Sequence, residues 1–135
     1  MTSRRSFDCR PESVTAARRF VRDTLGGEED TILDAAELMA SELTSNCVRH
    51  AGTAFEVGVS VGDEIRVEVA DAGGGRPRPL SPGPEEPSGR GLMIVEAMAA
   101  SWGVEPAERG KTVWFTLSRA PAGALVGGEL SRGAR

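Results

Sequence analysis

The chain has 135 residues, with 20 acidic and 16 basic side chains and a formal net charge of −4 at pH 7. This length predicts one domain that is large enough to bury a core. The acidic balance argues against a general nucleic-acid or membrane-surface binder, which would carry a basic excess. Two cysteines, Cys9 and Cys47, indicate a reducing compartment rather than a disulfide framework. Because no signal peptide and no apolar run of membrane-spanning length is visible, we expect a cytoplasmic protein.

The first part of the chain predicts an edge strand followed by a helix. The strand is expected around residues 5–10 and the helix over residues 11–25. Pro11 suits the first helical position, and the pair Gly26 and Gly27 ends the helix.

A central helix is predicted over residues 30–51, with Asp30 or Thr31 as its cap. Its apolar face consists of Ala36, Met39, Ala40, Leu43 and Cys47. Glu42 and Asn46 stack on the other face, about 5 to 6 Å apart. A carboxylate beside an amide oxygen suits magnesium, or a carboxylate base next to a metal ligand, although such pairs also occur on plain solvated helix faces.

Two alternating runs, residues 55–61 and 65–69, predict a β-hairpin with a Gly-Asp turn. The parity of the second strand turns Asp71 toward the core at the strand end. An inward carboxylate needs a donor, which is either the backbone of the following turn or an exocyclic amine of a ligand. Gly73 and Gly75 would let the backbone approach such a ligand closely.

The region that follows is rich in proline and glycine. Residues 76–88 contain five prolines and predict a loop, either a plain surface loop or a lid over a ligand. Gly89-Arg90-Gly91-Leu92 then leads into an apolar helix that ends at Ala100, and the free amides at such a helix start can bind phosphate. The arginines available to a phosphate chain are Arg76, Arg78 and Arg90. Two strands, residues 102–105 and 111–117, complete the fold before a tail.

Three motifs occur in a fixed order along the chain: Glu42 and Asn46 on a helix, then Asp71, Gly73 and Gly75 after a strand, then Gly89, Gly91 and Leu92 at a helix start. Together they resemble the motifs of the GHKL (histidine-kinase-like) ATPase superfamily. The run from Glu42 to Ala51 looks most like the anti-sigma-factor serine/threonine kinases, and the resemblance covers residues 7–118. It implies an α+β two-layer sandwich of the Bergerat type, with a mixed, mostly antiparallel sheet covered on one face by helices. Residues 1–118 would form a single ATP-binding domain, and residues 119–135 a flexible tail.

The resemblance also implies roles for single residues. Asn46 would bind Mg²⁺, Glu42 would act as general base, and Asp71 would accept from the adenine amino group. The phosphates would lie at Gly89, Gly91 and Leu92, with further nucleotide contacts from Arg49, His50, Ala51, Gly73, Gly75, Arg90 and Thr112. His50 has an alternative role as a cation at a helix end. Parity conflicts with the role of Thr112, because it points Lys111 inward and Thr112 outward.

The function implied is that of an anti-sigma factor that phosphorylates an anti-anti-sigma (STAS) protein and binds a sigma factor, without direct contact to nucleic acid or membrane. A homodimer through the first helix is as well supported as a simple packing role for that helix. The alternative is an ATP-binding interaction module of the same fold without kinase turnover. A standalone sensor histidine kinase is not expected, because the sole histidine, His50, lies inside the motif helix.

Overall fold

The computed structural model describes residues 1–72 and 87–119, with the side chains of 87–91 excepted. In chain order the elements are β1 (Thr2–Phe7), α1 (Pro11–Thr24), α2 (Asp30–Asn46), the π-helical turn η1 (Cys47–Ala51), β2 (Phe55–Val61), β3 (Glu64–Asp71), α3 (Pro87–Met98), β4 (Ser101–Pro106) and β5 (Lys111–Ser118).

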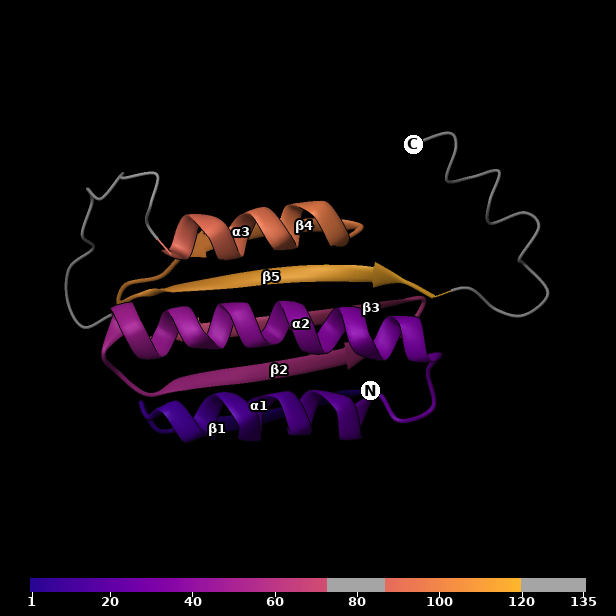
Figure 1. The fold of residues 1–135 in the computed structure, drawn as a ribbon, viewed down its shortest axis with the longest axis horizontal. Helices are drawn as coiled ribbons and strands as arrows, with labels where there is room; N and C mark the ends of the chain where they lie inside the picture. The colour runs from indigo at the N-terminus through magenta and orange to yellow at the C-terminus, as the bar shows by residue number, and fades with distance from the viewer. Residues whose placement is uncertain (73–86, 120–135) are drawn as a thin grey trace.

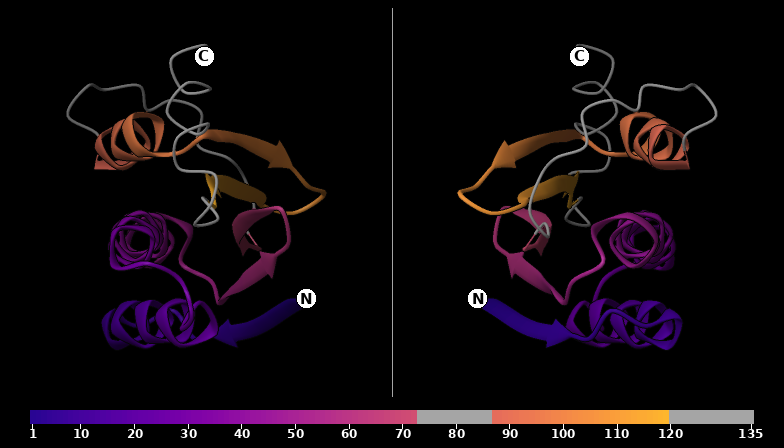
Figure 2. Two further views of the ribbon diagram at one scale, coloured as in Figure 1. Left: turned by 90° about the vertical axis from the view of Figure 1, so that its right-hand side faces the viewer. Right: turned by 90° about the vertical axis from the view of Figure 1, so that its left-hand side faces the viewer.

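The strands form one sheet in the order β1-β2-β3-β5-β4. All four pairings between these described strands are antiparallel, so this part of the sheet is antiparallel rather than mixed. The helices α1, α2 and α3 lie side by side on one face of the sheet, as Figures 1 and 2 show. The two-layer α+β fold expected from the sequence is therefore confirmed.

The core lies between the two layers and follows the predicted periodicities. The five apolar residues of the central helix named above are all buried, and so are Ile65, Val67 and Val69 of β3. Phe115 of β5 is the largest fully buried side chain. α2 is the central helix of its layer, because it packs against both α1 and α3 and rests on β3 and β5. This position brings the end of α2 close to the end of β3.

The other face of the sheet is polar and carries no helix in the described ranges. Arg4 on β1 bridges to Glu68 on β3 at 3.3 Å, and Glu68 accepts from Arg66 Nε at 2.8 Å. The Arg66 guanidinium lies 4.3 Å from the ring centroid of Trp114, whose indole covers Gly103 so closely that a Cβ there would clash. A solvated face of this kind explains why the described fold has two layers.

Several predicted bounds were wrong. β1 begins at Thr2, which pairs with Ser60, instead of around residue 5. The cap of α2 is Glu29, which makes no side-chain capping bond, so neither Asp30 nor Thr31 has that role. Residues 47–51 form a wider π turn, not a continuation of the α-helix. α3 begins at Pro87, because proline suits a first helical position, and not after Gly91. It ends at Met98 instead of Ala100.

Candidate functional site

Asp71 lies at the end of β3 and points toward the core, as the strand parity predicts. Its side chain is 3% exposed, and its Oδ2 accepts a hydrogen bond from Lys111 Nζ at 3.1 Å. The Lys111 side chain is half exposed, and the two residues are register partners on β3 and β5. The second oxygen, Asp71 Oδ1, is buried and has no hydrogen-bond partner in the described part of the chain. A buried acceptor without a donor costs about 1 to 3 kcal/mol, so this oxygen is a place where a ligand donor would be stabilising.

Two connections hold Asp71 in place. Gly110, in the turn between β4 and β5, has φ +77°, and a Cβ at this position would clash with the Asp71 carbonyl oxygen and Oδ1. This turn therefore requires glycine. The backbone N–H of Ala72 donates to Thr53 Oγ1 at 3.3 Å, which ties the end of β3 to the loop after η1.

Asn46 ends α2, and its amide oxygen, Oδ1, is the second buried acceptor without a partner among the described residues. Glu42 lies one turn earlier and is partly buried. No hydrogen bond or salt bridge reaches its carboxylate within residues 1–72 and 87–119. A carboxylate and an amide oxygen with free lone pairs are thus presented from one stretch of helix.

The π turn η1 follows directly and closes with Gly52, whose N–H donates to the Cys47 carbonyl oxygen at 3.3 Å. Gly52 has φ 69°, the left-handed conformation that glycine adopts without strain at a helix end. Such wide turns occur often at functional sites. Arg49 and His50 on this turn are exposed, and Ala51 is partly buried.

The carboxyl end of α2 lies at the same end of the molecule as the start of β5, where Asp71 at the end of β3 pairs with Lys111 (Figure 1). Burial is the main cause that raises the pKa of the Cys47 thiol to about 12, and the charge of Asp71 raises that pKa further, while Lys111 opposes the shift. Cys47 directly follows Asn46 in the chain. In Figure 1 the start of α3 lies at this end as well. The structure therefore brings Asn46, Asp71 and Lys111 to one end of the fold.

The predicted phosphate-binding glycines are placed differently from expectation. Gly89 and Gly91 lie inside the first turns of α3 instead of preceding it, because the helix begins at Pro87. Leu92 is partly buried and packs against the core. The start of α3 still presents unpaired backbone amides. The remaining predicted contacts of this region fall outside the residues or side chains described. They are Gly73, Gly75, Arg76, Arg78 and the side chain of Arg90.

Thr112 is not brought to this site. It pairs with Ala70 and Glu105, one position along from Lys111, and therefore faces the opposite side of the sheet from Asp71. Lys111 occupies the inward place instead. Its parity is visible in the sequence, but its bond to Asp71 is not, because the pairing of β3 with β5 depends on the tertiary fold. Gly110 and Thr53 carry no sequence motif that would have identified them.

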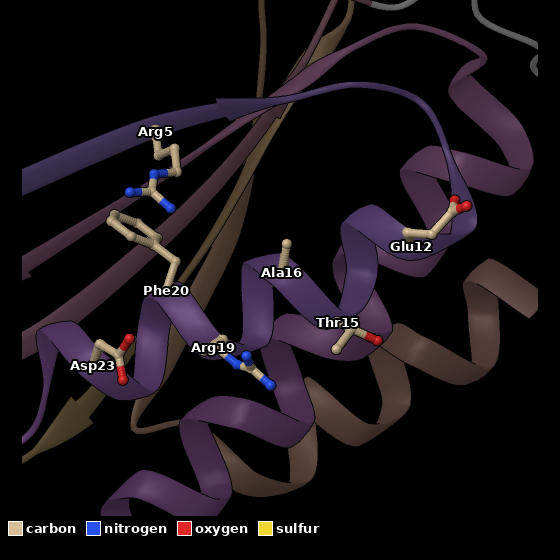
Figure 3. Close-up of a pocket in the computed structure, with 7 residues that line it drawn as sticks. All are labelled: Arg5, Glu12, Thr15, Ala16, Arg19, Phe20 and Asp23. Atoms are coloured by element: carbon tan, nitrogen blue, oxygen red, sulfur yellow. The ribbon is translucent and has the colours of Figure 1, made fainter.

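A hollow of about 590 Å³ lies elsewhere, between α1 and β1. Figure 3 shows Arg5 of β1 beside Phe20 of α1, with the guanidinium carbon 5.3 Å from the ring centroid. None of the predicted site residues lines it. The candidate site is thus defined by its unpartnered polar atoms and not by this hollow.

Comparison with known proteins identifies the family and the fold. The family model described as histidine kinase-like ATPase domain matches residues 7–117, and the chain belongs to this family. No curated protein sequence matches significantly.

Among solved structures, the fold is similar to the crystal structure of the RsbU and RsbW domains of Rv1364c from Mycobacterium tuberculosis, with a TM-score of 0.70 and 17% sequence identity. The match covers 88% of this chain and 32% of that one, so the chain spans about a third of that protein. Within the described ranges, none of the helices has the length and hydropathy that a membrane crossing requires.

Proposed function

We propose that this chain is an ATP-binding anti-sigma factor with serine/threonine protein kinase activity toward an anti-anti-sigma protein of the STAS type. ATP binding is what its family implies. The observation that carries the proposal is the pair of buried acceptors, Asn46 Oδ1 and Asp71 Oδ1, which lie at one end of the fold and have no partner in the part of the chain that the structure describes. Two such atoms in one small domain are costly unless a ligand satisfies them.

The two buried oxygens, Asp71 Oδ1 and Asn46 Oδ1, suit a magnesium nucleotide. Asp71 Oδ1 is an acceptor suited to the exocyclic amino group of adenine, since a carboxylate accepts and cannot donate. Asn46 Oδ1 is a hard oxygen ligand of the kind that Mg²⁺ prefers together with substrate phosphates. No group of three or more His, Cys, Asp or Glu that could hold a metal is found among the described residues. When bound, the metal would neutralise charge on the phosphates.

The backbone amides at the start of α3 supply the positive end of a helix dipole for the phosphates. Glu42, one turn before Asn46, would accept the proton of a protein hydroxyl as the hydroxyl oxygen attacks the γ-phosphorus and the bond to the ADP oxygen breaks. Phosphoryl transfer depends mainly on positioning and charge neutralisation, which is the work this small set of residues would do.

The acceptor and partners follow from the resemblance of the run Glu42 to Ala51 to anti-sigma-factor kinases, and the RsbW domain in the structural neighbour supports that class. The chain would bind a sigma factor, exchange it for the STAS protein and act in the cytoplasm. ATP hydrolysis without transfer to protein is not part of this proposal.

The test is transfer of labelled γ-phosphate to a serine of a candidate STAS partner. The wild type is expected to transfer, and Glu42→Gln is expected to lose transfer while ATP affinity stays the same. Asp34→Asn is the matched control, because Asp34 lies on the same helix with its side chain 73% exposed. Tight ATP binding with no transfer to any STAS partner would favour an interaction module without turnover, and equal transfer by Glu42→Gln would contradict the general-base role.

A further inference from the structure

The bond between Lys111 and Asp71 leaves the site with a donor beside an acceptor. Lys111 Nζ uses one hydrogen to bond Asp71 Oδ2 at 3.1 Å, and an ammonium group has three. Asp71 Oδ1, the other oxygen of the same carboxylate, has no partner among residues 1–72 and 87–119. Within these ranges the neighbouring atoms therefore offer one free acceptor and two free donor hydrogens.

This pattern matches one edge of adenine. The base presents an amino group at C6 that donates and, next to it, the ring nitrogen N1 that accepts. A carboxylate alone satisfies only the amino group. We infer that Lys111 is a base-recognising residue, which donates from Nζ to N1 of the adenine while Asp71 Oδ1 accepts from the C6 amino group. The inference rests on the proposed nucleotide site and adds a second specificity contact to it.

The placement of Lys111 supports this role over a purely structural one. Its side chain is 51% exposed while that of Asp71 is 3% exposed, so the ammonium lies where the buried carboxylate meets solvent. An ion pair with one partner this exposed contributes little to stability. Its position at the start of β5, directly after the turn of Gly110, fixes the backbone on which the side chain is carried.

The residue next along β5 cannot take this role. Thr112 faces the opposite side of the sheet, so its hydroxyl is directed away from Asp71. Among the described side chains around Asp71, Lys111 is the cation that bonds it.

The experiment compares ATP with 1-deaza-ATP, in which a C–H replaces N1 and only the acceptor is lost. Calorimetric titration of the wild type is expected to show about tenfold weaker binding of 1-deaza-ATP, the effect of one hydrogen bond to a charged donor. Lys111→Met, which keeps the four-atom apolar stem of the side chain and removes the ammonium, is expected to bind both nucleotides with the same affinity.

Arg66→Met is the matched control. Arg66 is a cation on β3, but it lies on the uncovered face over Trp114. This variant is expected to keep the full preference for ATP over 1-deaza-ATP.

The outcomes separate the two proposals. Equal affinity of the wild type for ATP and 1-deaza-ATP overturns the role of Lys111 and leaves the ATP site standing, as does a Lys111→Met variant that retains the tenfold preference. A wild-type chain that binds neither nucleotide overturns the ATP site and the Lys111 role together. The comparison within the wild type needs no variant to fold.

Discussion

Replacing Asp71 by asparagine is expected to weaken ATP binding without weakening the fold. The substitution keeps the shape of a side chain that is 3% exposed and removes only its charge and one acceptor. An asparagine that still accepts from Lys111 would turn its amide N–H groups toward the adenine amino group, which places a donor against a donor. The substitution is therefore expected to lower the affinity for ATP and to leave the stability of the apo protein nearly unchanged.

The magnitudes follow from the contacts of each oxygen. A hydrogen bond to a charged group contributes about 1.5 to 3 kcal/mol, so ATP affinity is expected to fall about 10- to 100-fold. In the apo protein the Lys111 ion pair contributes at most about 1 kcal/mol, because the lysine side chain is half exposed and solvent screens the pair. The loss of that pair is offset because a neutral amide costs less to bury than a carboxylate that is paired at one oxygen only. The free energy of unfolding is expected to stay within about 1 kcal/mol of the wild type.

Calorimetric ATP titration and urea denaturation of the apo protein measure the two quantities. Glu68→Gln is the control, because Glu68 lies on the same strand with its salt bridges on the uncovered face. It is expected to leave ATP affinity unchanged. Unchanged affinity in Asp71→Asn would refute the adenine contact, and a loss of affinity matched by an equal loss of apo stability would show that Asp71 is structural.

Four further outcomes are expected. Asn46→Ala should remove the magnesium dependence of ATP affinity, measured by titration with and without Mg²⁺. The stability of the apo protein should stay the same or rise. An intact magnesium dependence would exclude Asn46 as the metal ligand. Gly110→Ala should lower the free energy of unfolding by about 1 to 2 kcal/mol or more in urea denaturation, because Gly110 has a positive φ and a Cβ there would clash with Asp71. Gly62→Ala, in the open β2–β3 turn, is the control and should change the free energy of unfolding little. Phe115→Ala should cost about 3 to 5 kcal/mol by the same assay, and a cost below about 1 kcal/mol would contradict its place in the core.

The fourth concerns pH. The pKa of the Cys47 thiol is raised from 9.0 to about 12 by burial first and by the charge of Asp71 second. The folded state thus keeps a proton that the unfolded state loses, so the free energy of unfolding is expected to fall as the pH rises from about 9 toward 12. Cys47→Ala should show a shallower decline when denaturation is followed across that range, and an identical decline in both proteins would show that Cys47 does not titrate in this way.

The sequence predicts well those parts of the fold that depend on local periodicity. The apolar face of α2, the hairpin of β2 and β3, and the inward direction of Asp71 all follow from side-chain alternation along single elements, and each is confirmed. The bounds at α3 were less accurate, because a proline that starts a helix and a proline that interrupts a loop look alike in one sequence.

The site is only partly visible in the sequence. The motifs identify Asn46 and Asp71, whose unpartnered oxygens the structure then shows. The contact of Lys111 with Asp71 and the close approach of Gly110 depend on how β5 pairs with β3, residues about 40 positions apart in the chain. Contacts across a sheet are fixed by register and topology, which a local pattern does not specify.

The most direct test is a crystal structure of the chain with Mg²⁺ and a non-hydrolysable ATP analogue. The account predicts that Asp71 Oδ1 accepts from the adenine amino group, that Lys111 Nζ reaches N1 of the same base, and that Asn46 Oδ1 binds the metal. A nucleotide bound in another part of the fold, with Asp71 Oδ1 and Asn46 Oδ1 contacting neither the base nor the metal, would contradict it.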